Sequence, residues 1–251
     1  MAATLHFMTK RTQRRLAAIV AMDVAGYSRL MGVDEEATLA VLKAHRKVTD
    51  QISVRHGGRI VGSAGDGLLL EFPSVVEAVN YAIEIQSVMA GRDGDFPDDR
   101  KMLYRIGINV GDVLVDADDD IFGDGVNVAA RLEALAEPGG ICISRTARDQ
   151  VRDRMDVALK DMGEVEVKNI TRPVRVFRVL GEGEEASAPV RRRTSRWKYA
   201  AAAVGGGWAR RILDRLTRRA FRMKEGTSHP SRSYPLSICP TKRHRSILPT
   251  V

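Results

Sequence analysis

The chain has 251 residues, which is enough for one full domain with an appendage or for two small domains. Hydrophobic residues make up 44% of the chain and charged residues 29%, the composition of an ordinary globular protein. Two cysteines exclude a disulfide framework and lack the spacing of metal ligands. No apolar run approaches the roughly 18 residues of a membrane span.

The net charge of +8 is unevenly distributed along the chain. Residues 1–180 carry 24 Lys and Arg against 27 Asp and Glu, a net charge of −3. Residues 181–251 carry 16 against 5, a net charge of +11. Because the basic character belongs to the C-terminal segment, the charge gives no support to a nucleic-acid partner for the rest of the chain.

These patterns divide the chain into three parts. We expect a basic, disordered leader at 1–15, a folded domain at 16–180 and a basic tail at 181–251. The apolar run at 16–22 follows two arginines, as in a signal peptide, but it is short and ends at Asp23 without a small-residue cleavage site. Because an export signal is therefore disfavoured, we expect a cytoplasmic protein.

The tail at 181–251 begins with a linker of glycines and glutamates and contains five of the nine prolines and both tryptophans. Its composition favours a disordered segment. The stretch 199–209 is small and apolar but only 11 residues long, like the start of a membrane anchor that does not continue. A membrane-surface role for 208–222 is therefore a competing hypothesis, and a late change of reading frame is a third.

Strand and helix patterns alternate through the folded domain. Residues 16–24 form an apolar run of strand length, which suits the centre of a sheet. Asp34 predicts the N-cap of a helix, because two glutamates follow it and apolar residues then recur at spacings of three and four up to the glycine pair 57–58. Those apolar residues are Ala37, Val41, Ala44, Val48 and Ile52.

Two hairpins are predicted from glycine–aspartate turns. The first joins strands at 59–61 and 68–72 through Gly65-Asp66-Gly67. The second turns at Gly111-Asp112, within the strand-like segment 103–115.

Two further helices and three strands complete the domain. Ser74 to Glu77 form a capping box that opens one helix. Another follows Gly125, with Val128, Leu132 and Leu135 on its buried face. The remaining strands are expected at 141–144, 164–168 and 174–179. Strands mixed with helices and joined by hairpins describe an α+β sandwich, with helices packed on one face of a mainly antiparallel sheet.

Two aspartates stand out as candidates for chemistry. Asp23 ends an apolar, central strand, where an unpaired carboxylate is costly to bury. Asp66 lies at the tip of the first hairpin, where an aspartate taken alone is more often a turn residue. If the two strands are neighbours, the carboxylates converge and demand a cation. Two oxygen donors, completed by substrate phosphates, suit Mg²⁺ or Mn²⁺.

Asn127 and Arg131 are four residues apart, so on a helix they share one face. An amide and a guanidinium presented together can orient and neutralise a phosphoryl group in a transition state, although a solvated helix face has the same spacing.

Known nucleotide-binding and calcium-binding motifs are not found. The P-loop pattern does not occur, and the glycines at 123–125 lack the third glycine of a dinucleotide fingerprint. The aspartates at 116–120 lack the glycine and the closing glutamate of a calcium loop.

Taken together, these segments resemble the catalytic domain of class III nucleotidyl cyclases, in the subgroup common in soil bacteria. The resemblance covers about residues 14–180, in the order of the family. The matching segments are LAAIVAMDVAGYSRLMGVDEE, GGRIVGSAGDGLLLEFPS, YRIGINVGDV, DIFGDGVNVAARLEALAEPGGICIS and VKNITRPVRVFRV.

The resemblance implies a ferredoxin-like βααββαβ core that acts as a head-to-tail homodimer, with each active site shared between two chains. Asp23 and Asp66 match the family's metal-binding aspartates, which hold two Mg²⁺ or Mn²⁺ ions per site. From the other chain, Asn127 matches the residue that orients the ribose. Arg131 matches the residue that stabilises the transition state at the α-phosphate.

Two further matches concern the nucleotide. Lys168 falls where the family has a lysine for the terminal phosphates, and Asp120 matches the acid that accepts a hydrogen bond from the adenine amino group. Gly62 departs from the pattern, because the family has an adenine-reading lysine at this position, four residues before the second metal aspartate. Since glycine offers no donor to the base, selectivity then depends on Asp120, the backbone and nearby groups.

The resemblance therefore predicts an adenylate cyclase that converts ATP to 3′,5′-cyclic AMP and pyrophosphate. Two alternatives stay open: a catalytically weak or inactive nucleotide-binding regulatory module, and a guanylate cyclase. The expected partners are ATP and a second copy of this chain. Nucleic acid is not expected, and membrane contact through the basic tail is the less favoured alternative.

Overall fold

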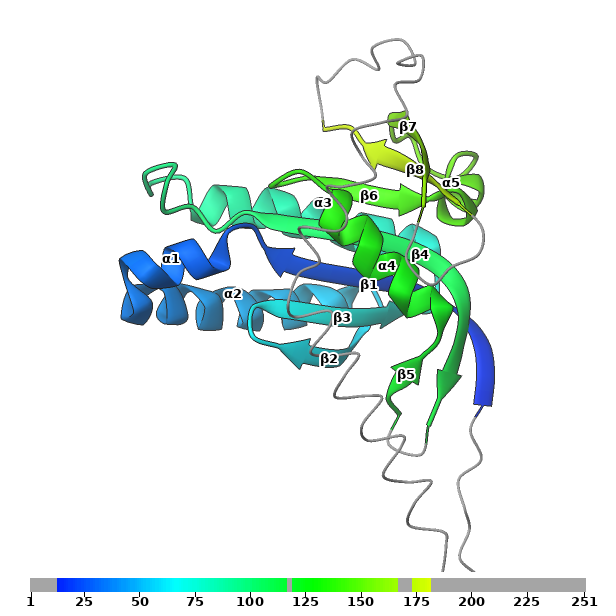
Figure 1. Ribbon diagram of the computed structural model, residues 1–251, viewed down its shortest axis with the longest axis horizontal. Coiled ribbons are helices and arrows are strands. Elements are labelled where there is room, and N and C mark those ends of the chain that lie inside the picture. The colour runs from blue at the N-terminus through cyan, green and yellow to red at the C-terminus, as the bar shows by residue number, and fades with distance from the viewer. Residues whose placement is uncertain (1–12, 117–118, 167–172, 182–251) are drawn as a thin grey trace, which may run out of the picture. The chain divides into compact units, whose positions relative to one another are not determined.

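The computed structural model describes residues 13–116, 119–166 and 173–181 (Figure 1). The expected tail lies outside the described residues apart from its first residue, and so does the expected leader apart from 13–15. Residues 13–15 belong to the first strand, which begins earlier than the sequence predicted.

Eight strands of the described residues form one sheet, in the order β2-β3-β1-β4-β6-β8-β7, with β5 paired to β4. Every pairing is antiparallel except that of β4 with β6, so the predicted mainly antiparallel α+β fold is confirmed. The strands are β1 (Gln13–Val24), β2 (Arg59–Ala64), β3 (Gly67–Phe72), β4 (Tyr104–Val115), β5 (Ile121–Phe122), β6 (Ile141–Ser144), β7 (Leu159–Val165) and β8 (Val174–Val179).

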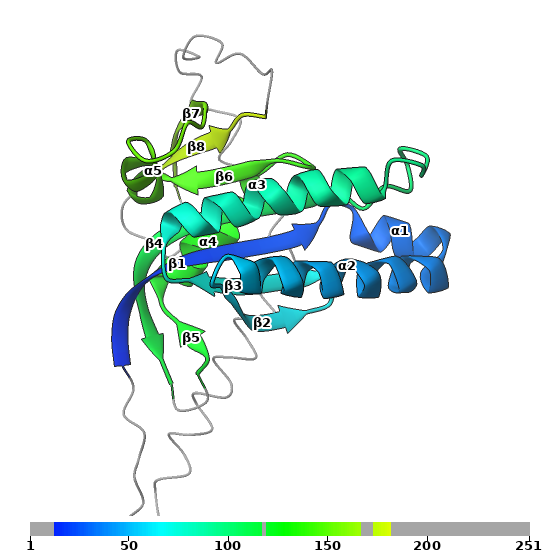
Figure 2. The same ribbon diagram turned by 180° about the vertical axis from the view of Figure 1, so that it is seen from behind.

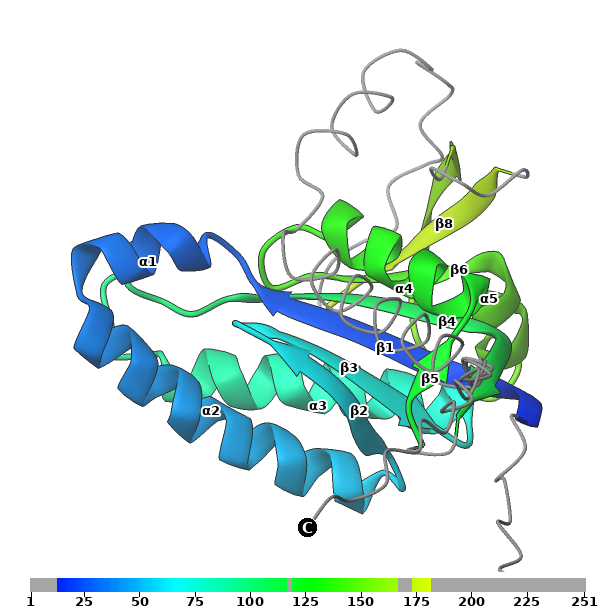
Figure 3. The ribbon, with the colours of Figure 1, turned by 60° about the horizontal axis from the view of Figure 1, so that its bottom comes forward.

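Five helices lie within the described residues, and they pack on both faces of the sheet. Helices α2 and α3 cover one face and α4 packs on the other (Figure 2 and Figure 3). The helices are α1 (Tyr27–Val33), α2 (Glu35–Arg55), α3 (Val75–Arg92), α4 (Asp124–Leu135) and α5 (Arg145–Val151). The expectation that the helices share one face is therefore wrong for α4.

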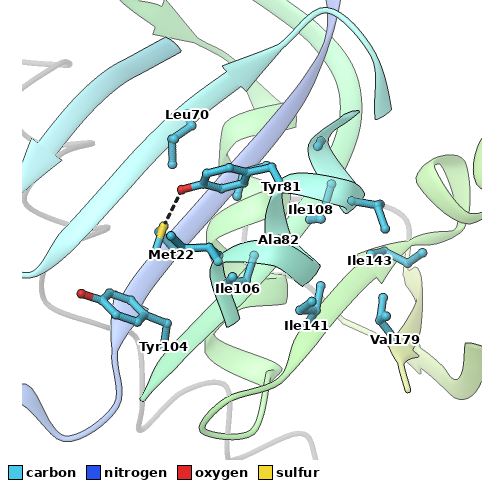
Figure 4. Packing of buried hydrophobic residues seen from close by; sticks show 14 of the residues in the cluster. Met22, Leu70, Tyr81, Ala82, Tyr104, Ile106, Ile108, Ile141, Ile143 and Val179 are labelled. Carbon is cyan, nitrogen blue, oxygen red and sulfur yellow. Dashed lines mark hydrogen bonds between the residues drawn. The ribbon is translucent and has the colours of Figure 1, made fainter. Parts of the chain in front are cut away.

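The strand β1 explains why both faces are covered. Successive side chains of a strand point to opposite faces, and β1 is apolar along most of its length, so each face needs its own cover. Ala18, Val20 and Met22 join the core beneath α2 and α3. In that core the Tyr81 hydroxyl lies 3.3 Å from the Met22 sulfur (Figure 4). The alternate residues of β1 pack with α4 on the opposite face and are Ala17, Ile19 and Ala21.

The second predicted hairpin does not exist, because β4 runs unbroken through Gly111-Asp112. This strand pairs with β1 over its whole length, and Gly111 lies opposite Ala17. A Cβ atom at Gly111 would come within 3.2 Å of the Gly125 Cα. The glycine thus allows the start of α4 to approach β4 closely, rather than forming a turn.

The predicted starts of α2 and α3 are correct, although only one cap forms as expected, and α4 begins at Asp124 rather than after Gly125. The Asp34 carboxylate accepts a hydrogen bond from the Ala37 amide at 3.0 Å at the start of α2. Helix α3 follows Ser74, but the Ser74 side chain makes no capping hydrogen bond. Glu77, the other half of the predicted capping box, contacts the His56 ring at 2.9 Å instead. Among the described helices, none has the length and apolar character needed to cross a bilayer.

Candidate active site

Asp23 lies near the end of β1 and is only 2% exposed. It pairs with Arg105 at the start of β4. The Arg105 guanidinium donates from Nε to Asp23 Oδ1 at 2.9 Å and from Nη2 to Oδ2 at 2.5 Å. A two-pronged contact of this kind fixes the plane of the carboxylate and supplies the charge that its burial requires.

Asp66 joins Asp23 from the turn between β2 and β3. It is 8% exposed, and its Oδ2 accepts a hydrogen bond from the Val24 amide at 3.2 Å. The amide of the residue after Asp23 thus binds Asp66, so the structure brings the two carboxylates to the same end of β1. The convergence predicted from the sequence is correct, while their role as metal ligands stays a prediction.

A side chain of α2, that of Arg46, binds the turn that carries Asp66. The Arg46 guanidinium donates through Nη2 to the carbonyl of Gly65, the residue before Asp66. Tyr27, at the start of α1, also lies near the turn: burial raises the pKa of its hydroxyl, and the Asp66 charge raises it further. Arg46 therefore helps to fix the direction in which Asp66 leaves the hairpin.

Glu133 is a third acid in this cluster, and the sequence analysis missed it. It lies on α4, is completely buried, and its Oε1 is 3.1 Å from Arg105 Nη2. Burial raises its pKa to about 10, and the neighbouring Asp23 also raises it. This raised pKa favours the protonated form of Glu133, with Arg105 balancing the charge of Asp23. An acid on the buried stripe of an amphipathic helix is the signal that would have revealed it.

Helix α4 can hold Glu133 here because it lies unusually close to β4. A Cβ atom at Gly107 would come within 2.1 Å of the Glu133 amide nitrogen and 2.2 Å of the Ala129 carbonyl oxygen. Real side chains never tolerate such contacts with backbone atoms, so the helix and strand can approach this closely only at a glycine.

The donor set fits a hard divalent cation. Asp23 and Asp66 supply carboxylate oxygens at one end of β1, which Mg²⁺ and Mn²⁺ prefer over nitrogen and sulfur. Within the described ranges, no group of three or more His, Cys, Asp or Glu side chains forms a complete metal cage. Mg²⁺ usually binds through one or two carboxylates, with waters and substrate phosphates as its other ligands. Two protein carboxylates are therefore sufficient for a Mg²⁺ site.

Asn127 and Arg131 share one face of α4, as predicted, and both are partly buried. The inward face of the helix carries Ala129 and Ala130, which pack on the sheet, and Glu133, which reaches Arg105. Arg131 lies two positions from Glu133, or about 200° around the helix. The amide–guanidinium pair is therefore presented on a different side of α4 from the Asp23 cluster of the same chain.

The structure describes one of the two residues predicted to contact the nucleotide. Asp120 lies in the loop before β5, where its amide donates to Asp116 Oδ1 at 3.1 Å and its carbonyl accepts from the Asp116 amide at 3.1 Å. These bonds close the loop and fix the backbone of Asp120. Lys168 lies outside the described residues. Gly62 lies in β2, where it pairs with Leu69 across a register shift.

A cleft of ≈ 860 Å³ lies elsewhere on the α4 side of the sheet. It runs between β4, the start of α4 and β8. None of the predicted site residues that the structure describes lines it. The cleft is therefore separate from the carboxylate cluster.

Comparisons with known proteins identify the family of this chain. The profile of the family described as "Adenylate and Guanylate cyclase catalytic domain" matches residues 10–181. The "Putative adenylate cyclase 3" of Rhizobium meliloti (strain 1021) is 49% identical over 166 residues, which cover 66% of this chain and 28% of that protein. The chain thus spans well under half the length of this relative.

Solved structures give the same result. The adenylate/guanylate cyclase/hydrolase from Silicibacter pomeroyi has 46% identity and a TM-score of 0.65, covering 68% of this chain and 100% of that one. The adenylyl cyclase CyaB from P. aeruginosa has 28% identity and a TM-score of 0.61, covering 68% and 96%. The resemblance seen in the sequence is thereby confirmed, and the chain belongs to the adenylate and guanylate cyclase catalytic domain family.

Proposed function

We propose that this chain is an adenylate cyclase, which converts ATP to 3′,5′-cyclic AMP and pyrophosphate at sites shared by two copies of the chain. The observation that carries the proposal is the meeting of Asp23 and Asp66, joined through the Val24 amide, at one end of β1. Two carboxylates that converge beside a single arginine offer the oxygen ligands that a divalent cation prefers.

The carboxylates of Asp23 and Asp66 would hold Mg²⁺ or Mn²⁺, two ions per site. Such ions lower the pKa of a bound hydroxyl and neutralise charge on phosphate oxygens. Arg105 fixes the orientation of Asp23 through two hydrogen bonds, and the Val24 amide does the same for Asp66. The ligands are therefore preorganised, so little reorganisation is needed when substrate binds.

Asn127 and Arg131 would act on the nucleotide itself. The Asn127 amide would orient the ribose so that its 3′-hydroxyl lies in line with the α-phosphate. The Arg131 guanidinium would stabilise the negative charge that develops on the phosphoryl oxygens in the transition state. Lys168 would bind the terminal phosphates and assist the departure of pyrophosphate.

The direction of α4 supports a site shared by two chains. Glu133 on this helix reaches the Asp23 cluster of its own chain, so Asn127 and Arg131 are turned away from that cluster. A second copy in head-to-tail arrangement would bring its Asn127 and Arg131 opposite Asp23 and Asp66 of the first. A symmetric pair of chains then contains two equivalent sites.

Asp120 favours ATP over GTP. Adenine carries an amino group, a donor, where guanine carries the oxygen O6, an acceptor. The Asp120 carboxylate would accept from the adenine amino group and repel the guanine oxygen. The loop that holds Asp120 is closed by hydrogen bonds to Asp116, which supports this assignment.

The test is turnover of ATP and of GTP by the purified chain with Mg²⁺ or Mn²⁺. We expect cyclic AMP and pyrophosphate in equal amounts, with faster turnover of ATP than of GTP. Faster turnover of GTP would identify a guanylate cyclase. Metal-dependent nucleotide binding without any cyclic product would identify a regulatory module, an alternative that the loss of a base-reading side chain at Gly62 favours.

A further inference from the structure

The strand β2, which carries Gly62, also carries an arginine, Arg59, on the same face of the sheet. A β-bulge between Ile60 and Gly62 adds one residue to β2. The alternation of side chains between the two faces of the sheet therefore shifts by one residue at this point. Arg59 pairs with Glu71 and Gly62 pairs with Leu69, and these two β3 residues face the α4 side of the sheet. Arg59 and Gly62 therefore share that face.

The Arg59 side chain is oriented from two directions. Its Nε and Nη2 lie 2.9 and 2.7 Å from Glu71 Oε2, and Glu71 is buried. Its Nη1 donates to the carbonyl of Asp119 at 3.0 Å. Asp119 is the residue before Asp120, so one arginine joins β2 to the loop that carries the proposed adenine contact.

The Asp119 backbone has an uncommon conformation at the place where Arg59 binds its carbonyl. Asp119 has a φ of 62°, in the left-handed region that non-glycine residues rarely adopt. Conformations of this kind persist where surrounding contacts hold them, and they are common at functional sites. The bond from Arg59 is one such contact, and it fixes the position of Asp120.

The Arg59 guanidinium has N–H groups that its contacts with Glu71 and Asp119 do not use. A guanidinium has five N–H groups, and the contacts with Glu71 and Asp119 engage three of them. The side chain is 41% exposed, so the guanidinium is partly accessible from solvent. A guanidinium hydrogen-bonded to the loop that carries Asp120 would match the edge of adenine together with that carboxylate, because adenine presents an amino donor beside a ring-nitrogen acceptor.

We propose that Arg59 is a specificity-determining residue, which donates to the base beside Asp120 and favours adenine over guanine nucleotides. It thus supplies from β2 the donor that Gly62 lacks. This inference rests on the proposed function, because it concerns the base-binding part of the same site.

The experiment measures equilibrium binding of the α,β-methylene analogues of ATP and GTP with Mg²⁺. These analogues cannot release pyrophosphate, so the measurement does not depend on turnover. We expect wild-type protein to bind the adenine analogue more tightly. The Arg59→Ala variant should lower the ratio of the two affinities about tenfold, the effect of losing roughly one hydrogen bond to a charged donor. Arg59→Lys should restore part of the ratio.

Arg15 provides a matched control, because its Nη1 contacts the other oxygen of Glu71. The Arg15→Ala variant should keep the wild-type ratio of affinities. An unchanged ratio in Arg59→Ala, an equal loss in Arg15→Ala, or wild-type protein that does not discriminate between the analogues would each overturn the inference. Failure of the proposed function is seen separately, as the absence of cyclic product from wild-type protein.

Discussion

Arg105 donates to both carboxylate oxygens of Asp23, with Nε 2.9 Å from Oδ1 and Nη2 2.5 Å from Oδ2, across the neighbouring strands β4 and β1. The same Nη2 lies 3.1 Å from Oε1 of the buried Glu133. One guanidinium thus holds a proposed metal ligand and the helix that carries Asn127 and Arg131. A contact made within one chain therefore fixes parts of both of the proposed shared sites.

Removing Arg105 should destabilise the protein, because it leaves the buried Asp23 without its countercharge. We expect Arg105→Met to lower the free energy of unfolding by about 3–5 kcal/mol, the cost of breaking a buried ion pair from one side. Urea denaturation measures this loss. Adding Asp23→Asn to the same variant should recover part of it, since the uncompensated charge is then gone. A double variant no more stable than Arg105→Met would contradict the assigned pairing.

Glu133 should make the stability of the protein depend on pH. Its pKa is raised from an ordinary 4.5 to about 10 in the folded state, so the folded protein holds a proton that the unfolded chain releases. Its contribution to stability is therefore complete below about pH 4.5 and is lost as pH rises toward 10. Relative to wild type, Glu133→Gln should gain stability between pH 5 and pH 9, measured by urea denaturation at each pH. A constant difference would contradict a neutral Glu133.

Gly107 should not tolerate a methyl group. The added Cβ would overlap backbone atoms of Ala129 and Glu133, so α4 would have to move away from β4. We expect Gly107→Ala to cost about 1–3 kcal/mol or more of unfolding free energy, the range for overpacking a close contact. Gly91→Ala is the control: apart from its own helix backbone and chain neighbours, no atom lies within 4 Å of its Cβ position near the end of α3, so it should not destabilise the protein. Equal effects would contradict the close packing of α4.

The sequence predicted the main elements where the patterns were long. The apolar run of β1 and the helix α2 were both predicted correctly, because several residues or turns carry the same signal. The apolar stripe predicted for α2 is not its buried face, because Ile52 alone of the stripe's residues is buried. The residues that α2 buries are Thr38, Leu42, His45, Thr49, Ile52 and Ser53. Helices α1 and α5 were missed, since each has only seven residues and buries at most two of them. The false hairpin at Gly111 arose because a glycine required for close packing has the same local signature as a turn.

The candidate site was predicted only where a local pattern in the sequence pointed to a residue. Asp23 and Asp66 stood out because a carboxylate at the end of an apolar strand is conspicuous. Arg105 was missed, because its partner Asp23 is 82 residues away in the chain and only the strand register joins them. Glu133 was missed because its environment depends on how α4 crosses β4. Pairing across the sheet, rather than local pattern, therefore assembles the electrostatics of the site.

Complementation between two inactive variants tests the shared site most directly. Asp23→Asn should remove the metal-binding half of each site, and Arg131→Ala the half that stabilises the transition state, so each variant alone should make no cyclic AMP. After the two are mixed in equal amounts and allowed to exchange subunits, each mixed dimer should contain one intact site. The mixture should then recover roughly a quarter of wild-type activity, as expected for random pairing of two-fold symmetric dimers. A mixture as inactive as its components, with subunit exchange verified, would contradict a site built from two chains.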